Sequence, residues 1–70
     1  MDEDSLNIQV RKLLKKVGIQ SQREIENTIK EKYANGLLEG IDVLDVSIKL
    51  EIEEIGLKIP IQGKIELRMQ

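Results

Sequence analysis

Residues 44–69 read LDVSIKLEIEEIGLKIPIQGKIELRM, and this stretch decides the fold. Side chains alternate between apolar and polar in two runs, 44–52 and 57–69, which is the period of strands with one buried face. The apolar positions are Leu44, Val46, Ile48, Leu50 and Ile52, and then Leu57, Ile59, Ile61, Ile65, Leu67 and Met69, with Gly63 in the same phase. The pattern predicts two strands at about 44–52 and 57–69.

The four residues between the runs, Glu53–Gly56, fit a type I turn closed by a glycine at positive φ. An antiparallel hairpin that closes with Ile52 opposite Leu57 also puts Leu50 opposite Ile59, Ile48 opposite Ile61 and Leu44 opposite Ile65, so these pairs are apolar on one face. A slip of one residue would invert one strand, so the pattern fixes the register. Pro60 has no N–H and must direct its nitrogen away from the partner strand, so the second strand is expected at a sheet edge.

A helix is expected over about residues 6–17. Its apolar residues recur at the spacing of one helix face: Leu6, Val10, Leu13, Leu14 and Val17. Asp4 or Ser5 is expected to cap its start, and Gly18 to end it. Ile8 lies off this face.

A second helix is expected over about residues 22–35. Ser21 and Glu24 form an S-x-x-E capping box, and Asn35-Gly36 is a strong stop because both residues tolerate the left-handed conformation. These elements predict one α+β domain over residues 1–70, in which two N-terminal helices pack on a C-terminal antiparallel β-hairpin (ααββ).

The residue inventory disfavours catalysis. The chain has no His and no Cys, so it lacks the commonest general base, a thiolate nucleophile and the usual transition-metal ligands. Carboxylates such as Glu51, Glu53, Glu54 and Glu66 lack the spacing of a calcium loop and are expected on a solvated edge. No catalytic residue, metal or cofactor is predicted.

Six cationic residues are the candidate site for nucleic acid: Arg11, Lys12, Lys15, Lys16, Arg23 and Lys30. Residues 13–22 are similar to the helix, turn and capped second helix of helix-turn-helix proteins, and the hairpin would then serve as a wing. Phosphate binding is disfavoured by the net charge of −2 and by the acidic turn at Glu53-Glu54. A divergent winged-helix-like nucleic-acid-binding domain is therefore the alternative function, and the first four cations are expected on a solvated helix face.

Residues 13–26, LLKKVGIQSQREIE, resemble a signature of a family of short bacterial proteins of unknown function. Gly56-Leu57 and the stretch 63–67, GKIEL, resemble the C-terminal part of the same family. The resemblance covers most of the chain, and it implies no activity, cofactor or partner. Gln22-Arg23-Glu24 is the segment to probe, because it is more elaborate than a helix cap requires.

The sequence thus favours a small non-enzymatic accessory or protein-interaction domain with an unidentified protein partner. No apolar run is long enough to span a membrane, and a cytoplasmic location is expected. A weak symmetric homodimer through an open sheet edge is a further expectation, since unpaired strand edges can template another chain.

Overall fold

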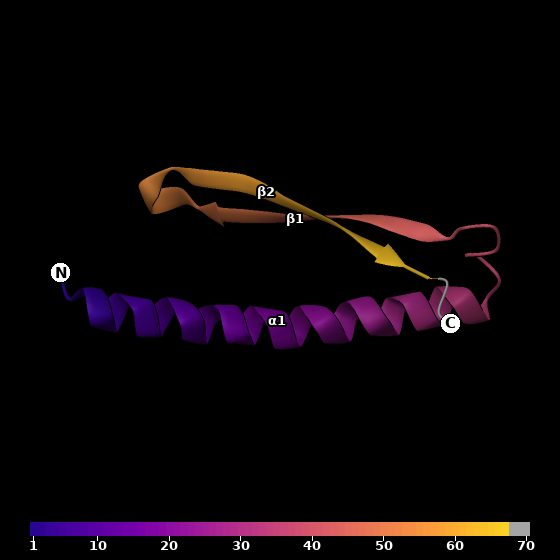
Figure 1. Cartoon of the computed structure of the whole chain (residues 1–70), viewed down its shortest axis with the longest axis horizontal. Coiled ribbons are helices and arrows are strands. Elements are labelled where there is room, and N and C mark those ends of the chain that lie inside the picture. The colour runs from indigo at the N-terminus through magenta and orange to yellow at the C-terminus, as the bar shows by residue number, and fades with distance from the viewer. Residues whose placement is uncertain (68–70) are drawn as a thin grey trace. The chain divides into compact units, whose positions relative to one another are not determined.

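The computed structural model describes residues 1–67, which form one helix and one β-hairpin (Figure 1). The elements are α1 (Glu3–Ala34), β1 (Val43–Ile52), a short 3₁₀ turn (Glu53–Ile55) and β2 (Leu57–Glu66). They form two compact units, Met1–Leu38 and Glu39–Gln70. The fold is therefore α+β. The single domain predicted over residues 1–70 stays a prediction.

The prediction of two N-terminal helices was wrong, because α1 runs without a break for 32 residues. Gly18 has no positive φ and continues the helix, and Ser21 lies in the helix interior rather than at a cap. A glycine inside a helix costs only about 1 kcal/mol relative to alanine, whereas a break would free four N–H and four C=O groups. The helix-turn-helix interpretation of residues 13–22 loses its turn for the same reason.

The apolar pattern itself runs through the expected break. From Leu6 to Thr28 the positions on one face follow each other at spacings of four, four and three residues, which repeats every eleven residues. An eleven-residue repeat matches a nearly straight helix. The positions are Leu6, Val10, Leu14, Val17, Ser21, Ile25 and Thr28. The two predicted helices are therefore in phase and belong to one face.

The ends of α1 follow standard capping chemistry. Asp2, rather than the expected Asp4 or Ser5, is the N-cap, and its Oδ1 accepts hydrogen bonds from the Asp4 and Ser5 amides at 3.0 and 3.3 Å. The stop at Asn35-Gly36 is confirmed. Gly36 has a φ of 74°, and the Gly36 and Leu37 amides donate to Tyr33 and Lys32 carbonyls, which is a Schellman motif.

The hairpin has the predicted register. Ile52 pairs with Leu57, Leu50 with Ile59 and Leu44 with Ile65, antiparallel throughout. The turn is closed by Gly56 at a φ of 67°, and its amide donates to the Glu53 carbonyl at 3.1 Å. Strand β1 begins one residue before the predicted start, and β2 ends at Glu66. The predicted extension of the strand through residues 68 and 69 lies outside the described residues.

Neither unit holds a buried core, since no side chain among residues 1–67 is buried. The most covered apolar side chains are only half-buried. They are Ile25 and Ile29 on the helix, Leu44, Val46, Leu50, Leu57 and Ile65 on the strands, and Leu38 and Leu67 outside these elements. A lone helix and a two-stranded sheet each present their apolar face without a layer of their own to cover it.

Substitutions at Gly18 and Ser21 test the continuous helix. Gly18→Ala should stabilise α1 by about 0.5–1 kcal/mol, because alanine has less backbone freedom to lose in a helix interior. Ser21→Ala should be neutral or slightly stabilising. Urea unfolding followed by far-UV circular dichroism measures both. A loss of about 1 kcal/mol with Ser21→Ala would show instead that Ser21 caps a helix, and it would favour the arrangement with two helices.

Gly56→Val tests the turn. A β-branched residue resists positive φ, so the variant should lose about 1–3 kcal/mol of hairpin stability in urea unfolding. Gly63→Val is the matched control, because Gly63 lies in β2 without a positive φ and with open space where a Cβ would stand. It should be neutral or stabilising. Equal losses in the two variants would contradict the turn geometry.

Candidate functional site

One face of the hairpin is apolar along its whole length. The register aligns the aliphatic residues of the two strands in cross-strand pairs, interrupted only where Val46 lies opposite Gly63. Three isoleucines on this face are widely open, with exposed fractions of 43% for Ile48, 44% for Ile59 and 47% for Ile61. Such a contiguous apolar surface is typical of an interaction site.

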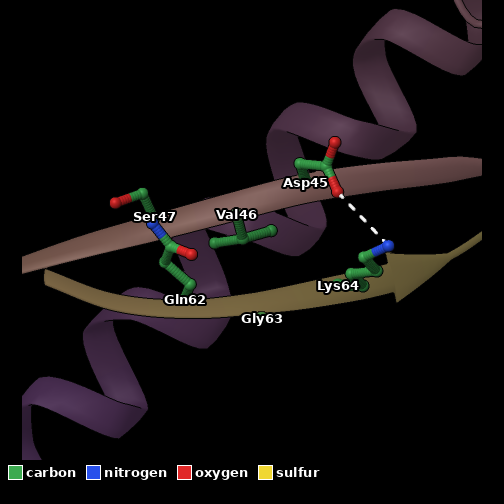
Figure 2. A pocket seen from close by; sticks show the side chains of 6 residues that line it. All are labelled: Asp45, Val46, Ser47, Gln62, Gly63 and Lys64. Atoms are coloured by element: carbon green, nitrogen blue, oxygen red, sulfur yellow. Dashed lines mark ion pairs between the residues drawn. The ribbon is translucent and has the colours of Figure 1, made fainter.

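The opposite face of the hairpin is polar. The Lys64 Nζ lies 4.0 Å from the Asp45 Oδ1, and the Lys58 Nζ lies 4.0 Å from the Glu51 Oε2. Figure 2 shows the Asp45–Lys64 pair and, beside it, the Ser47 and Gln62 side chains on adjacent strands, around a shallow hollow that Gly63 also lines. Both ion pairs are exposed and contribute little to stability.

Lys49 has no such partner. It lies opposite Pro60, and no ion pair joins it to any residue within 1–67. The charge of Lys49 is therefore uncompensated on the polar face.

The two outer edges of the hairpin differ in their hydrogen-bonding groups. The Leu67 amide donates to the Asp42 carbonyl at 2.8 Å. In an antiparallel pair of strands, hydrogen-bonded and non-hydrogen-bonded residue pairs alternate, so every second pair from there toward the turn is hydrogen-bonded. The even-numbered residues of β1 therefore bond to β2, and the odd-numbered ones, 43–51, direct N–H and C=O outward. On β2 the outward positions include Pro60, which lacks an N–H, as expected from the sequence.

The helix presents an apolar stripe, composed of Leu6, Val10, Leu13, Leu14 and Val17. These side chains are exposed by 41–57%. Farther along α1, Ile25 and Ile29 continue the stripe and are half-buried. An apolar stripe on one side of a helix normally faces a packing partner.

The six predicted nucleic-acid residues all lie on α1 and are all exposed: Arg11, Lys12, Lys15, Lys16, Arg23 and Lys30. At 3.6 residues per turn they lie away from the N-terminal part of the stripe, although Arg11 shares the angular position of Ile29. Two exposed isoleucines, Ile8 and Ile19, lie among them. Each isoleucine lines a shallow hollow on the helix surface together with Lys12 and Lys15. Continuity of α1 brings these cations onto one helix instead of two.

In the Gln22-Arg23-Glu24 segment, Gln22 has a structural role. The Gln22 Nε2 donates to the Glu26 Oε1 at 2.8 Å, one turn along the helix, which is a stabilising pair on an exposed helix surface. Glu24 is an ordinary helical residue, and its predicted role in a capping box is wrong because no helix begins there.

The described residues, 1–67, do not form a metal site. Within residues 1–67 no group of three or more His, Cys, Asp or Glu side chains is arranged to hold a metal ion. The surfaces that the structure does assemble are the apolar hairpin face, the open β1 edge, the apolar helix stripe and the basic helix side.

Sequence reasoning missed two features of these surfaces. The stripe continues across Gly18, and the signal for this was the unbroken spacing of three and four residues. The uncompensated Lys49 was also missed, although the predicted register already placed it opposite Pro60.

The helix α1 is not apolar enough over a sufficient length to cross a membrane, and α1 is the sole α-helix among residues 1–67. No curated protein and no solved structure is detectably similar to the chain. A sequence family does match it: DUF6494, described as a family of unknown function, aligns with residues 1–68. The match covers nearly the whole chain, which therefore belongs to this family of unknown function.

Proposed function

We propose that the chain is a non-enzymatic, cytoplasmic interaction module whose apolar helix stripe and apolar hairpin face are buried by contact with another polypeptide. The observation that carries this proposal is that no side chain among residues 1–67 is buried. The absence of His and Cys from the sequence supports a role without catalysis.

Both units have much apolar surface still to bury. The chain has eleven Ile, nine Leu and four Val, which is enough aliphatic side chain to form a core. Full burial of one such side chain contributes roughly 1.5–3 kcal/mol. A two-stranded hairpin alone is marginal in water, and most helix stability in proteins comes from packing of an amphipathic face. A partner surface would supply the missing contribution to both units.

The lengths of the two units support the same proposal. A helix of 32 residues extends about 48 Å at 1.5 Å per residue. Each strand has 10 residues and extends about 33 Å. Each apolar surface is therefore long enough to contact a partner over several helical turns or residue pairs. The N-terminal part of the stripe, with Leu6, Val10 and Leu14, is rich enough in apolar side chains to form such a contact.

Leu14→Glu tests this proposal against Ile19→Glu. The two side chains are almost equally exposed, at 51% and 52%, but lie about 140° apart around the helix. An affinity-tagged chain expressed in the native host with an untagged copy should recover a second polypeptide, which mass spectrometry identifies. Leu14→Glu should reduce the recovery at least about tenfold, because a carboxylate would be desolvated in the contact.

Ile19→Glu is the matched control and should recover the partner as the unsubstituted chain does. Failure of the tagged, folded chain to recover any polypeptide in comparable amount, whether a second copy or another protein, would contradict the proposal. Loss with Ile19→Glu alone would move the contact to the basic side of α1.

Nucleic-acid binding is the second candidate function, and one observation favours it. Residues 5–23 contain five Lys or Arg side chains and no Asp or Glu, so one continuous helix carries a local positive charge. Three observations weigh against it: the net charge of −2, the acidic turn at Glu53-Glu54 and the absence of a helix-turn-helix in residues 13–22. The interaction module is therefore the better supported function.

Duplex DNA should bind with a Kd of about 10⁻⁴ M or weaker at physiological salt, as for a protein without a dedicated phosphate surface. Fluorescence anisotropy over a salt series measures this. The double substitution Lys15→Glu/Lys16→Glu should change the weak binding little. A sub-micromolar, steeply salt-dependent Kd that the double substitution abolishes would establish the alternative instead.

A further inference from the structure

We propose that the partner polypeptide is a second copy of this chain, joined edge to edge through β1 around a two-fold axis at Ser47. The result is a continuous antiparallel sheet in the order β2, β1, β1 of the second copy and β2 of the second copy. This inference rests on the proposed interaction function: it identifies the partner as a second copy, and it adds a contact at the β1 edge to the burial of the apolar stripe and the apolar hairpin face.

The edge of β1 is the one suited to pairing. All five of its outward residues, 43, 45, 47, 49 and 51, have an N–H and a C=O directed away from β2. Within residues 1–67 no third strand uses these groups, because the sheet consists of β1 and β2 alone. On β2, Pro60 removes one outward donor near the middle of the strand. The unpaired groups of β1 can template a strand of the same kind.

The alternation of side chains restricts where the two-fold axis can lie. The outward backbone groups belong to odd-numbered residues, so an odd residue of one copy must bond to an odd residue of the other. The same rule keeps the apolar, even-numbered side chains of both copies on one face of the sheet. The axis must therefore pass through a residue. Ser47 and Ile48 are the two central residues of β1, which spans Val43–Ile52. A two-fold axis through either residue lets the two β1 strands overlap along almost their whole length.

Charge decides between these two positions. An axis at Ser47 places Asp45 opposite Lys49 of the second copy, and symmetry makes this attractive pair occur twice. An axis at Ile48 instead places Asp45 opposite Glu51 twice, and directly opposed like charges destabilise a strand pair. Lys49 is also the β1 cation that lacks an ion pair within the hairpin, since it lies opposite Pro60. The register at Ser47 gives Lys49 a carboxylate neighbour.

The register at Ser47 also matches the side chains near the axis on both faces, whereas at the ends of the strands Val43 lies opposite Glu51 of the second copy. On the apolar face it pairs Leu44 with Leu50 and Val46 with Ile48 of the second copy, at positions where opposed side chains are closest. On the polar face the two Ser47 hydroxyls meet at the axis, with Gln62 of each hairpin next to its own Ser47 (Figure 2). A sheet of four strands with one apolar face exceeds the size at which sheets become independently stable.

Two charge substitutions test this register: each one alone should weaken the dimer, and a mixture of the two variants should restore dimer formation. Asp45→Lys places two lysines opposite each other at both pairs of the dimer, and Lys49→Asp places two aspartates there. Each single variant should raise the dimer Kd about tenfold in sedimentation equilibrium, since two attractive pairs become repulsive. A 1:1 mixture should form a heterodimer with a Kd within about threefold of the unsubstituted dimer, because every lysine then faces an aspartate. Native mass spectrometry identifies that heterodimer.

Lys58→Asp is the matched control. It reverses the same charge on the same face of the hairpin, but Lys58 lies on β2 opposite Glu51 and has no partner across the β1 edge. Its dimer Kd should stay within about twofold of the unsubstituted value. Circular dichroism of all three variants verifies that the hairpin is retained.

Three results would overturn the inference: a mass fixed at the 8.0 kDa of one chain up to millimolar concentration, single variants that dimerise normally, or a tighter dimer with Asp45→Lys, which an axis at Ile48 predicts. A monomeric chain that still recovers a different protein in the Leu14→Glu experiment would overturn only the second-copy inference. The proposed interaction function would then stand.

Discussion

Aliphatic side chains make up one stripe of α1 and one face of the hairpin, and neither unit carries a second layer that could bury them. A single helix buries nothing within itself, and a two-stranded sheet covers neither of its own faces. The structure reflects this constraint directly, since no side chain in residues 1–67 is buried. Both units thus carry apolar surface that no layer of their own covers, and the proposed function follows from where that surface would be buried.

The hairpin could be predicted almost completely from the sequence, because its determinants are local and agree with one another. Alternation assigns each residue to a face, and Gly56 supplies the positive φ that the turn needs. Pro60 is tolerated because its position in the register directs the nitrogen outward. No other register satisfies these conditions together.

The helix is less predictable from the sequence, because its local start and stop signals conflict with the phase of the apolar pattern. Gly18 and Ser21 are each typical of helix ends, but such residues change helix stability by only about 1 kcal/mol. The spacing of the apolar residues on both sides of Gly18 was the stronger signal. A pattern that keeps its phase from Leu6 to Thr28 indicates one helix, since a turn between two helices would have no reason to preserve that phase.

The candidate site was predicted in part. The helical wheel predicts Arg11, Lys12, Lys15 and Lys16 on a solvated helix face, and all four side chains are exposed; their role in binding stays a prediction. The packing of the helices on the hairpin stays a prediction, because the helix and the hairpin belong to two separate compact units. Self-complementary charge at the β1 edge was implicit in the register, but it becomes apparent only when Asp45 and Lys49 are considered across a two-fold axis.

Amide hydrogen exchange at the two sheet edges tests this account most directly. The outward amides of Ser47 and Lys49 on β1 should exchange more slowly as protein concentration rises, because they become bonded to the second copy. The outward amides of Gln62 and Lys64 on β2 should stay fast at every concentration. Fast exchange at Ser47 and Lys49 in concentrated protein, or concentration-dependent protection of Gln62 and Lys64 instead, would contradict the account.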